Sequence, residues 1–245
     1  TTETLYLLGC QERIVGISGF TVRPMEARDE KPKVSTFLDA NFDKIVALRP
    51  DVVFAFSDLQ AEIVKELIVR GIQVVAFNQR SIREILQMIQ IVGGIVGKQS
   101  DAEALVARFE QRLNDVASRT NGKPRPRVYF EEWGDPLISG IRWVSELIEI
   151  AGGEDIFAEL RVHHRAKDRI VQSEEVVRRN PDIIIGSWCG RPFKKEQVRQ
   201  RPGWERIAAI QTNQLYEIKS SIILQPGPAA LTDGLDELVR IIQRR

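Results

Sequence analysis

One short pattern occurs twice in the chain, once on each side of a long predicted helix. Residues 43–54 (DKIVALRPDVVF) align with residues 174–185 (EEVVRRNPDIII). Each copy has the pattern of a helix, a Pro-Asp turn and a buried apolar strand. Two copies of one helix-turn-strand unit favour two α/β lobes of related build.

The segment between the copies, residues 100–122, has the strongest helical pattern in the chain. Ser100 and Glu103 match a capping box, and Asn121-Gly122 predicts the helix end. Apolar residues recur at steps of three and four, at Ala102, Leu105, Val106, Phe109, Leu113 and Val116. We therefore predict an α/β fold with mainly parallel sheets: an N-terminal lobe at 1–97, a single backbone helix at 98–122 and a C-terminal lobe at 123–245.

The remaining elements follow from apolar periodicity and from Gly and Pro punctuation. Helices are expected at residues 2–9, 41–49, 58–70, 81–94, 143–150, 173–179 and 228–242. Strands are expected at 13–17, 51–56, 72–77, 127–131, 182–187 and 214–218. Loops are expected at 20–35, 132–136 and 188–193.

Composition excludes several classes of protein. With a net charge of +1 over 245 residues, a nucleic-acid-binding surface is not expected. No apolar run reaches the length of a membrane span, and residues 1–9 lack the basic and apolar regions of a signal peptide. Two cysteines, Cys10 and Cys189, make neither a disulfide framework nor a zinc site, and whether they pair stays open.

Aromatic side chains gather where the predicted strands end or helices begin. Ligands of open α/β sheets bind beyond the carboxyl ends of the strands. Aromatic residues make up only 7% of the chain, yet several fall in these loops. The candidates for a broad apolar ligand surface between the lobes are Phe37, Phe56, Ser57, Trp133, Arg142, Trp143 and Trp188. Core packing is the competing interpretation for each aromatic residue taken singly.

Signals of catalysis are weak. The chain has no G-x-S-x-G, P-loop or G-x-G-x-x-G motif. Glu131 and Glu132 would point to opposite faces of a strand and so would not form an acid/base couple. His163 and His164 are adjacent, so on a helix or strand they would point in different directions and would not easily chelate one ion. Either could still serve as a ligand or general base, and a simple solvated position is the competing interpretation. The basic run 191–206 is expected to be a solvated helix face.

Further motifs run along nearly the whole chain. They are the helix at Thr2-Glu3, Val34-Ser-Thr36 before the first repeat, GIRWVSELIEIAGG at 140–153, the segment 153–157, Ser173-Glu174-Glu175 with Asn180-Pro-Asp182, RPGW at 201–204 and Pro226-Gly-Pro228. In these motifs the chain resembles the substrate-binding proteins of ABC importers for iron-siderophores and cobalamin. The Val-Ser-Thr-aromatic and Trp-Val-Ser-Glu-Leu stretches are most similar to the cobalamin branch.

The resemblance implies a function and a set of partners. The protein would be a non-enzymatic, monomeric carrier outside the cytoplasmic membrane, with no cofactor or metal of its own. It would capture cobalamin or a related corrinoid in an aromatic inter-lobe cleft and deliver it to an ABC importer permease. Phe37 matches the position of an aromatic residue against the corrin. Asp43 and Glu205 match the carboxylates that dock the permease, with Asp43 in place of the more usual Glu.

Several alternatives remain. A siderophore or haem carrier of the same fold is the nearest, although Arg142 is the only cation placed in the predicted cleft. An enzyme using His163 or His164 is a second, and a metal-ion binder with three or four convergent ligands is a third. Axial ligation of cobalt by either histidine also stays open. A single connecting helix would permit closure of only a few degrees.

Overall fold

The chain divides into two α/β units in a computed structural model that describes residues 1–244. The first unit contains Thr1–Gln79 and Arg83–Val106. The second contains Arg80–Ile82 and the residues from Ala107 onward. Most strand pairs are parallel, and the predicted α/β class is confirmed. None of the described helices combines the length and apolar character needed to cross a bilayer.

The first unit contains two short parallel strand pairs, β1 with β2 and β3 with β4. Its elements are α1 (Thr2–Leu7), η1 (Gln11–Arg13), β1 (Ile17–Ser18), α2 (Met25–Glu30), β2 (Lys33–Ser35), α3 (Phe42–Ala47), β3 (Val53–Phe56), η2 (Asp58–Gln60), α4 (Ala61–Val69), β4 (Val74–Phe77) and most of α5 (Ile82–Ile95). The predicted loop at 20–35 is wrong in part, because it contains both α2 and β2. The strand expected at 13–17 is limited to β1, since residues 11–13 form a 3₁₀ turn.

The repeat predicted from the sequence extends to the backbone conformation. In the first unit α3 leads to β3, and in the second α8 (Ser173–Arg179) leads to β8 (Ile183–Gly186). The residue before the proline is left-handed in both copies, with φ 47° at Arg49 and 45° at Asn180. Proline disfavours a right-handed helical residue before it, so neither helix continues as far as the proline.

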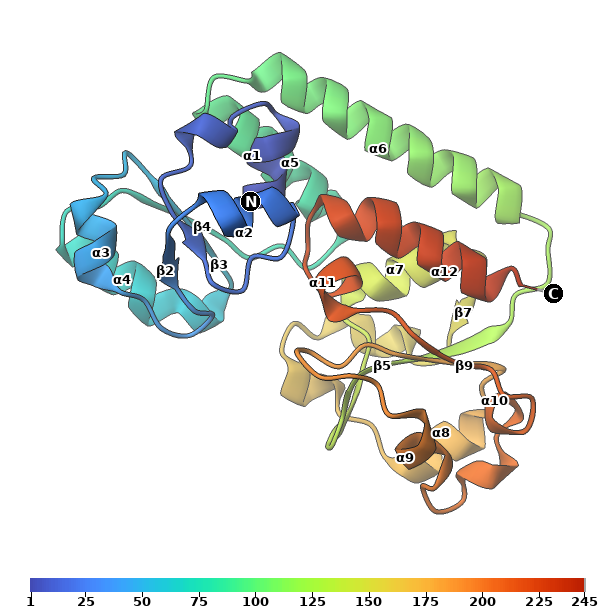
Figure 1. The fold of residues 1–245 in the computed structure, drawn as a ribbon. Helices are drawn as coiled ribbons and strands as arrows, with labels where there is room; N and C mark the ends of the chain where they lie inside the picture. Colours follow the sequence, from blue (N-terminus) through green and yellow to red (C-terminus); the bar gives the residue numbers. More distant parts are fainter. Residues whose placement is uncertain (245) are drawn as a thin grey trace. The chain divides into compact units, whose positions relative to one another are not determined.

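The long helix α6 covers Gln99–Thr120 and is 22 residues long (Figure 1). All six residues of the predicted apolar stripe are buried, and Gly122 follows the helix with φ 73°. The expected capping box is wrong, because the helix already includes Gln99 and Ser100 is its second residue. Glu103 instead accepts a hydrogen bond from the Gln99 side chain at 2.9 Å. The boundary between the units falls after Val106, within this helix.

The second unit is built on one sheet with the strand order β6-β5-β8-β9, and β7 pairs with β5. Its elements are β5 (Arg127–Gly134), β6 (Leu137–Ser139), α7 (Arg142–Ile150), β7 (Glu154–Asp155), η3 (Ala158–Val162), η4 (Ala166–Arg169), α8, β8, α9 (Lys195–Arg199), η5 (Trp204–Arg206), α10 (Ala208–Gln211), β9 (Leu215–Glu217), α11 (Ser220–Ile223), a π turn η6 (Ala230–Gly234) and α12 (Leu235–Ile242). Only β6 is antiparallel among these strand pairs.

Side chains alternate across this sheet between two cores. Tyr129, Ile184 and Leu215 lie side by side on β5, β8 and β9 and pack with residues of α8, α9 and α10. Val128 faces the other way, where Gly153 lies against Val128, Ile148 of α7 and Ile242 of α12. Figure 1 accordingly shows α7 and α12 on one side of β5 and α8 to α10 on the other.

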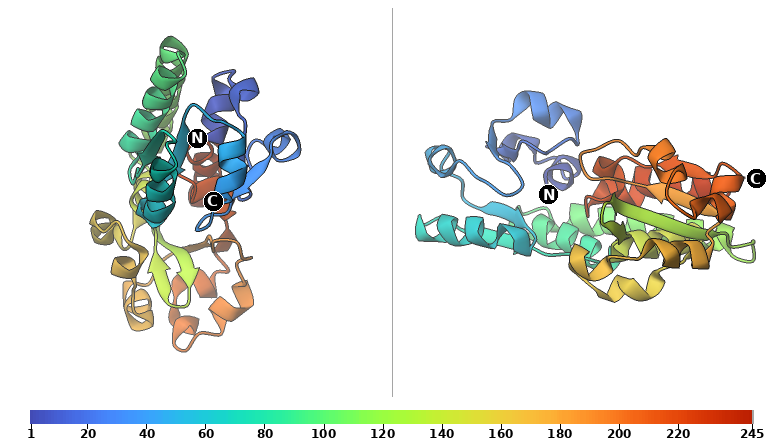
Figure 2. Two further views of the ribbon diagram at one scale, coloured as in Figure 1. Left: turned by 90° about the vertical axis from the view of Figure 1, so that its left-hand side faces the viewer. Right: turned by 90° about the horizontal axis from the view of Figure 1, so that it is seen from below.

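The loop predicted at 132–136 is largely a hairpin. Strand β5 continues to Gly134 and turns at Asp135-Pro136 into β6, and this hairpin is visible in the left view of Figure 2. The pairing register shifts between Glu131 and Trp133, which marks a β-bulge. Bulges redirect side chains and are common beside binding sites.

Candidate functional site

In the first unit, three predicted ligand residues lie together at the carboxyl end of β3. Ser57 follows Phe56, has φ 75° and donates its backbone N–H to the Phe77 carbonyl at 2.7 Å. Gln60 joins the segments: its amide nitrogen donates to the Phe37 carbonyl and its oxygen accepts from the Phe56 N–H, both at 2.9 Å. Phe37 is 37% exposed and Ser57 is buried. Sequence reasoning missed Gln60, because nothing in its local pattern shows that it links residue 37 to residue 56.

In the second unit, Trp133 and Trp188 lie near the hairpin and both are half-buried. The Trp133 indole N–H donates to the Asp135 carbonyl at 2.7 Å. The Arg191 guanidinium lies 5.1 Å from the centre of the Trp133 ring. Trp188 follows β8 and packs edge-on against Phe193, with ring centres 5.3 Å apart. Both tryptophans therefore have a fixed orientation and a partly open surface.

Two adjacent carboxylates fix the base of this hairpin. Glu131 is fully buried and holds Arg201 in a bidentate pair at 2.6 and 3.0 Å. Glu132 holds the buried Arg169 in a second bidentate pair at 2.8 and 3.1 Å. The sequence-based expectation that these carboxylates would not act as a couple agrees with their separate partners. Arg201 is only 16% exposed at its side chain, so the expected solvated face at 191–206 is wrong at this residue.

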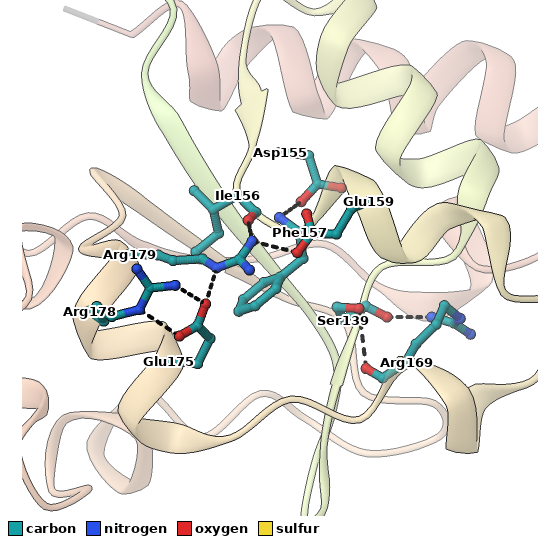
Figure 3. Close-up of polar contacts among 9 residues, drawn as sticks. All are labelled: Ser139, Asp155, Ile156, Phe157, Glu159, Arg169, Glu175, Arg178 and Arg179. Atoms are coloured by element: carbon teal, nitrogen blue, oxygen red, sulfur yellow. Dashed lines mark hydrogen bonds and ion pairs between the residues drawn. The ribbon is translucent and has the colours of Figure 1, made fainter.

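Figure 3 shows polar contacts that Arg169 and Arg179 form in the second unit. Arg169 donates to the Ser139 carbonyl, and the Ser139 hydroxyl donates to the Arg169 carbonyl at 3.2 Å. Arg179 lies 4.3 Å above the Phe157 ring and pairs with both Glu159 and Glu175.

The carboxylates in this region have altered acidity. Hydrogen bonds from Arg178 and then Arg179 lower the pKa of Glu175 from 4.5 to about 2. Burial raises the pKa of Asp155 above its ordinary 3.8. A depression of about 480 Å³ opens beside Phe157, Glu175 and Arg178. Its arginines are already matched by carboxylates, so it has no free positive charge to offer an anion.

Two other predicted ligand residues have different surroundings from those expected. Trp143 lies in the first turn of α7, in agreement with the helix expected at 143–150, but it is only 3% exposed. Its indole N–H donates to the Ile223 carbonyl at 2.8 Å, so it is part of the core of the second unit. Arg142 is exposed and pairs with Glu146 four residues later, at 2.8 Å. Glu146 also accepts the Ile82 N–H at 2.8 Å, which fixes the start of α5.

The two predicted docking carboxylates are both accessible. The Asp43 side chain is 97% exposed in the first turn of α3, and one oxygen lies 3.7 Å from Arg70. It borders an open depression of about 380 Å³ lined by residues 39–43 and Arg70. Glu205 lies in η5 with a side chain that is 66% exposed, near Arg206 at 3.7 Å. Both carboxylates could meet a basic partner.

The groups proposed for alternative chemistry are not brought together. His163 and His164 are both exposed, at and after the end of η3. Within residues 1–244, no three His, Cys, Asp or Glu side chains converge as a metal site would require. Cys10 is buried, Cys189 is exposed, and both are free thiols.

Comparison with known proteins gives the class of the chain. A family model described as periplasmic binding protein matches residues 1–222, and the chain belongs to this family. Its members are ABC transporter substrate-binding proteins, which are transport components without enzymatic activity and carry a ligand instead of a cofactor. The chain is 26% identical over 251 residues to the uncharacterised ABC transporter substrate-binding lipoprotein YvrC of Bacillus subtilis, covering 98% of this chain and 76% of that protein.

Other relatives define the range of ligands within the class. A vitamin B12-binding protein of Vibrio parahaemolyticus is 23% identical over 94% of this chain and 82% of its own length. The fold matches the vitamin B12-binding protein BtuF of Vibrio cholerae with TM-score 0.76, 21% identity and coverage of 100% and 94%. It also matches the heme-binding protein RhuT of Roseiflexus sp. with TM-score 0.81, 20% identity and coverage of 99% and 95%. The proteins that this periplasmic binding protein resembles thus include vitamin B12-binding and heme-binding members.

Proposed function

We propose that the protein captures cobalamin or a related corrinoid outside the cytoplasmic membrane and delivers it to an ABC importer. The observation that carries the proposal is the set of aromatic residues at and just beyond the carboxyl ends of the strands. Phe37 and Phe56 in the first unit, and Trp133 and Trp188 in the second, offer partly open aromatic surface. A large, flat and weakly charged ligand gains affinity by covering such surface, at roughly 25 cal/mol per Å² before ordering costs.

Two cations of the second unit are already paired, which supports a weakly charged ligand. Arg142 is paired with Glu146, and Arg201 is paired with Glu131. A ferric siderophore with several negative charges would need cations that are free to pair with it. The vitamin B12-binding relatives support the same choice. The cleft between the lobes and the contacts of each predicted residue stay predictions.

Haem is the second candidate, and one observation favours it. Arg191 is exposed and lies over Trp133, so a planar ligand with carboxylates could pair with this cation. The solved heme-binding neighbour also matches the fold at least as well as the vitamin B12-binding one.

Calorimetric titration with cyanocobalamin, haemin and a ferric hydroxamate siderophore separates these candidates. We expect saturable binding of cyanocobalamin, weakened about tenfold in Phe37→Ala, because removing one aromatic contact costs on the order of 1–2 kcal/mol. Val69→Ala removes an exposed apolar side chain at the end of α4, which leads to the amino end of β4, so this control should leave affinity unchanged. Saturable binding of haemin or the siderophore alone would reject the corrinoid.

We also propose that Asp43 and Glu205 dock the permease, because each offers an exposed carboxylate to a basic socket. Asp43→Ala and Glu205→Ala should leave ligand affinity unchanged and lower uptake in a reconstituted importer. Asp43→Glu should retain uptake, since it keeps the charge. Full uptake by an Asp43→Ala, Glu205→Ala double variant would contradict this role.

A further inference from the structure

We infer that Glu131 is a positioning residue for ligand binding: its buried carboxylate fixes the Trp188 indole in the orientation that presents the ring to the ligand. The inference rests on the proposed function, in which Trp188 contacts the ligand. It adds a role for an acidic residue that is itself inaccessible to any ligand, since Glu131 has no exposed surface.

The contact between the two side chains is direct. The Trp188 indole N–H donates to Oε1 of Glu131 at 3.0 Å. The same carboxylate receives Arg201 Nη1 on Oε2 at 2.6 Å and Nη2 on Oε1 at 3.0 Å. The carboxylate therefore has partners on both oxygens and cannot rotate without breaking charge-assisted hydrogen bonds. A fixed acceptor in turn fixes the direction of the indole N–H.

Packing also restricts the Trp188 ring near its nitrogen atom. A Cβ atom on Gly134 would lie 2.6 Å from Cζ2 and 2.9 Å from Cε2 of Trp188, so the ring occupies the space that a side chain would take. Phe193 meets the ring edge-on. The nitrogen-bearing edge is thus directed inward to the hairpin, while the residue as a whole stays half-buried.

Arg201 connects this arrangement to the core. Its guanidinium lies 4.5 Å from the centre of the Trp204 ring, and Trp204 is fully buried and donates its indole N–H to Ser173 at 2.7 Å. Trp204 in turn packs edge-on against Tyr129, with ring centres 6.1 Å apart. Glu131 is therefore held by a rigid layer, as a residue that positions a binding group must be.

Glu132 offers a matched control within the same strand. It also forms a bidentate pair with a buried arginine, Arg169, but the hydrogen bonds that lead from that arginine reach Ser139 and not Trp188. If the carboxylates only stabilise the hairpin, Glu131→Gln and Glu132→Gln should have similar effects. If Glu131 positions Trp188, only Glu131→Gln should change the indole.

The test compares Glu131→Gln, Glu132→Gln, Trp188→Phe and the double variant Glu131→Gln, Trp188→Phe. The first readout needs no ligand: the indole N–H signal of Trp188 in a ¹⁵N NMR spectrum, identified by its loss in Trp188→Phe. We expect Glu131→Gln to shift this signal and accelerate its exchange with water, and Glu132→Gln to leave it unchanged. An unchanged signal in folded Glu131→Gln would overturn the inference.

The second readout is cyanocobalamin affinity. Glu131→Gln should weaken binding about tenfold, the scale of one hydrogen bond to a charged group. In a protein that already carries Trp188→Phe, Glu131→Gln should weaken cyanocobalamin binding by less than about twofold, because the effect acts through Trp188. An equal loss in both backgrounds would show that Glu131 acts through another residue and would reject the inference.

If Glu131→Gln does not fold, Glu131→Asp replaces it, because the shorter side chain keeps the charge for Arg201 but cannot reach both partners. If the wild-type protein binds no corrinoid, the proposed function fails while the NMR comparison still decides whether Glu131 orients Trp188.

Discussion

Single residues of this chain differ in how far their surroundings follow from local sequence. The alternation of a strand is enough to predict that Glu131 and Glu132 would not act together. Their arginine partners are Arg201 and Arg169, which lie 70 and 37 residues away in the sequence. No local pattern identifies such partners, since they depend on which strands and loops the fold brings together.

Trp143 gives a prediction about stability. Trp143→Phe removes the indole hydrogen bond to Ile223 and leaves a buried carbonyl without its donor, which should lower the free energy of unfolding by about 1–3 kcal/mol. Urea denaturation measures this change. The Kd for cyanocobalamin should change by less than about twofold. A tenfold change would correspond to about 1.4 kcal/mol of binding free energy. Loss of affinity at unchanged stability would instead restore Trp143 to the binding surface, as its sequence motif predicted.

Glu175 gives a prediction about acid stability. Its pKa is lowered from 4.5 to about 2 by Arg178 and Arg179, so the unfolded chain takes up a proton at higher pH than the folded chain. The stabilisation from this carboxylate is present above pH 4.5 and is lost as the pH falls toward 2. Glu175→Gln should therefore show a flatter decline of unfolding free energy over this interval. Urea denaturation curves that run parallel for the two proteins would contradict the lowered pKa.

Elements were predicted well where apolar periodicity or a repeat marked them. The two helix-turn-strand copies, the apolar stripe of α6 and helices α7 and α8 are present. The failures have physical causes. Helix α2 is short and lies between Pro24 and Pro32, and the three-residue strand β2 follows directly after Pro32. The hairpin beyond Glu131 depends on pairing with β6. Short elements stabilised by tertiary contacts leave little trace in local sequence.

Two adjacent glycines of α5 test the packing of this helix against α6. A Cβ on Gly93 would lie 2.2 Å from the Cβ of Ala102, whereas a Cβ on Gly94 meets nothing within 4 Å. Gly93→Ala should therefore destabilise by about 1–3 kcal/mol. Gly94→Ala should stabilise by up to about 1 kcal/mol, because alanine is the better helix former. Thermal or urea denaturation of both variants gives the comparison, and equal effects would refute this close approach.

For the whole molecule, the class of protein followed from motifs spread along the chain and agrees with its family. Which residues bind the ligand stays a prediction. The predicted set included Phe37, Phe56, Ser57, Trp133 and Trp188, but it also included the core residue Trp143. It omitted Gln60 and Glu131, which organise the others through backbone and buried contacts. The types and sequence positions of these residues predict a binding surface. The contacts that fix their side chains in place depend on the fold.

The identity of the ligand is the central claim, and competition tests it most directly. The protein is dialysed to equilibrium against equimolar cyanocobalamin and haemin, and the absorption spectrum of the retained protein shows which ligand is bound. The account predicts retention of one cyanocobalamin per chain with little haemin. Retention of haemin with no cyanocobalamin would contradict it and would identify a haem carrier of the same family.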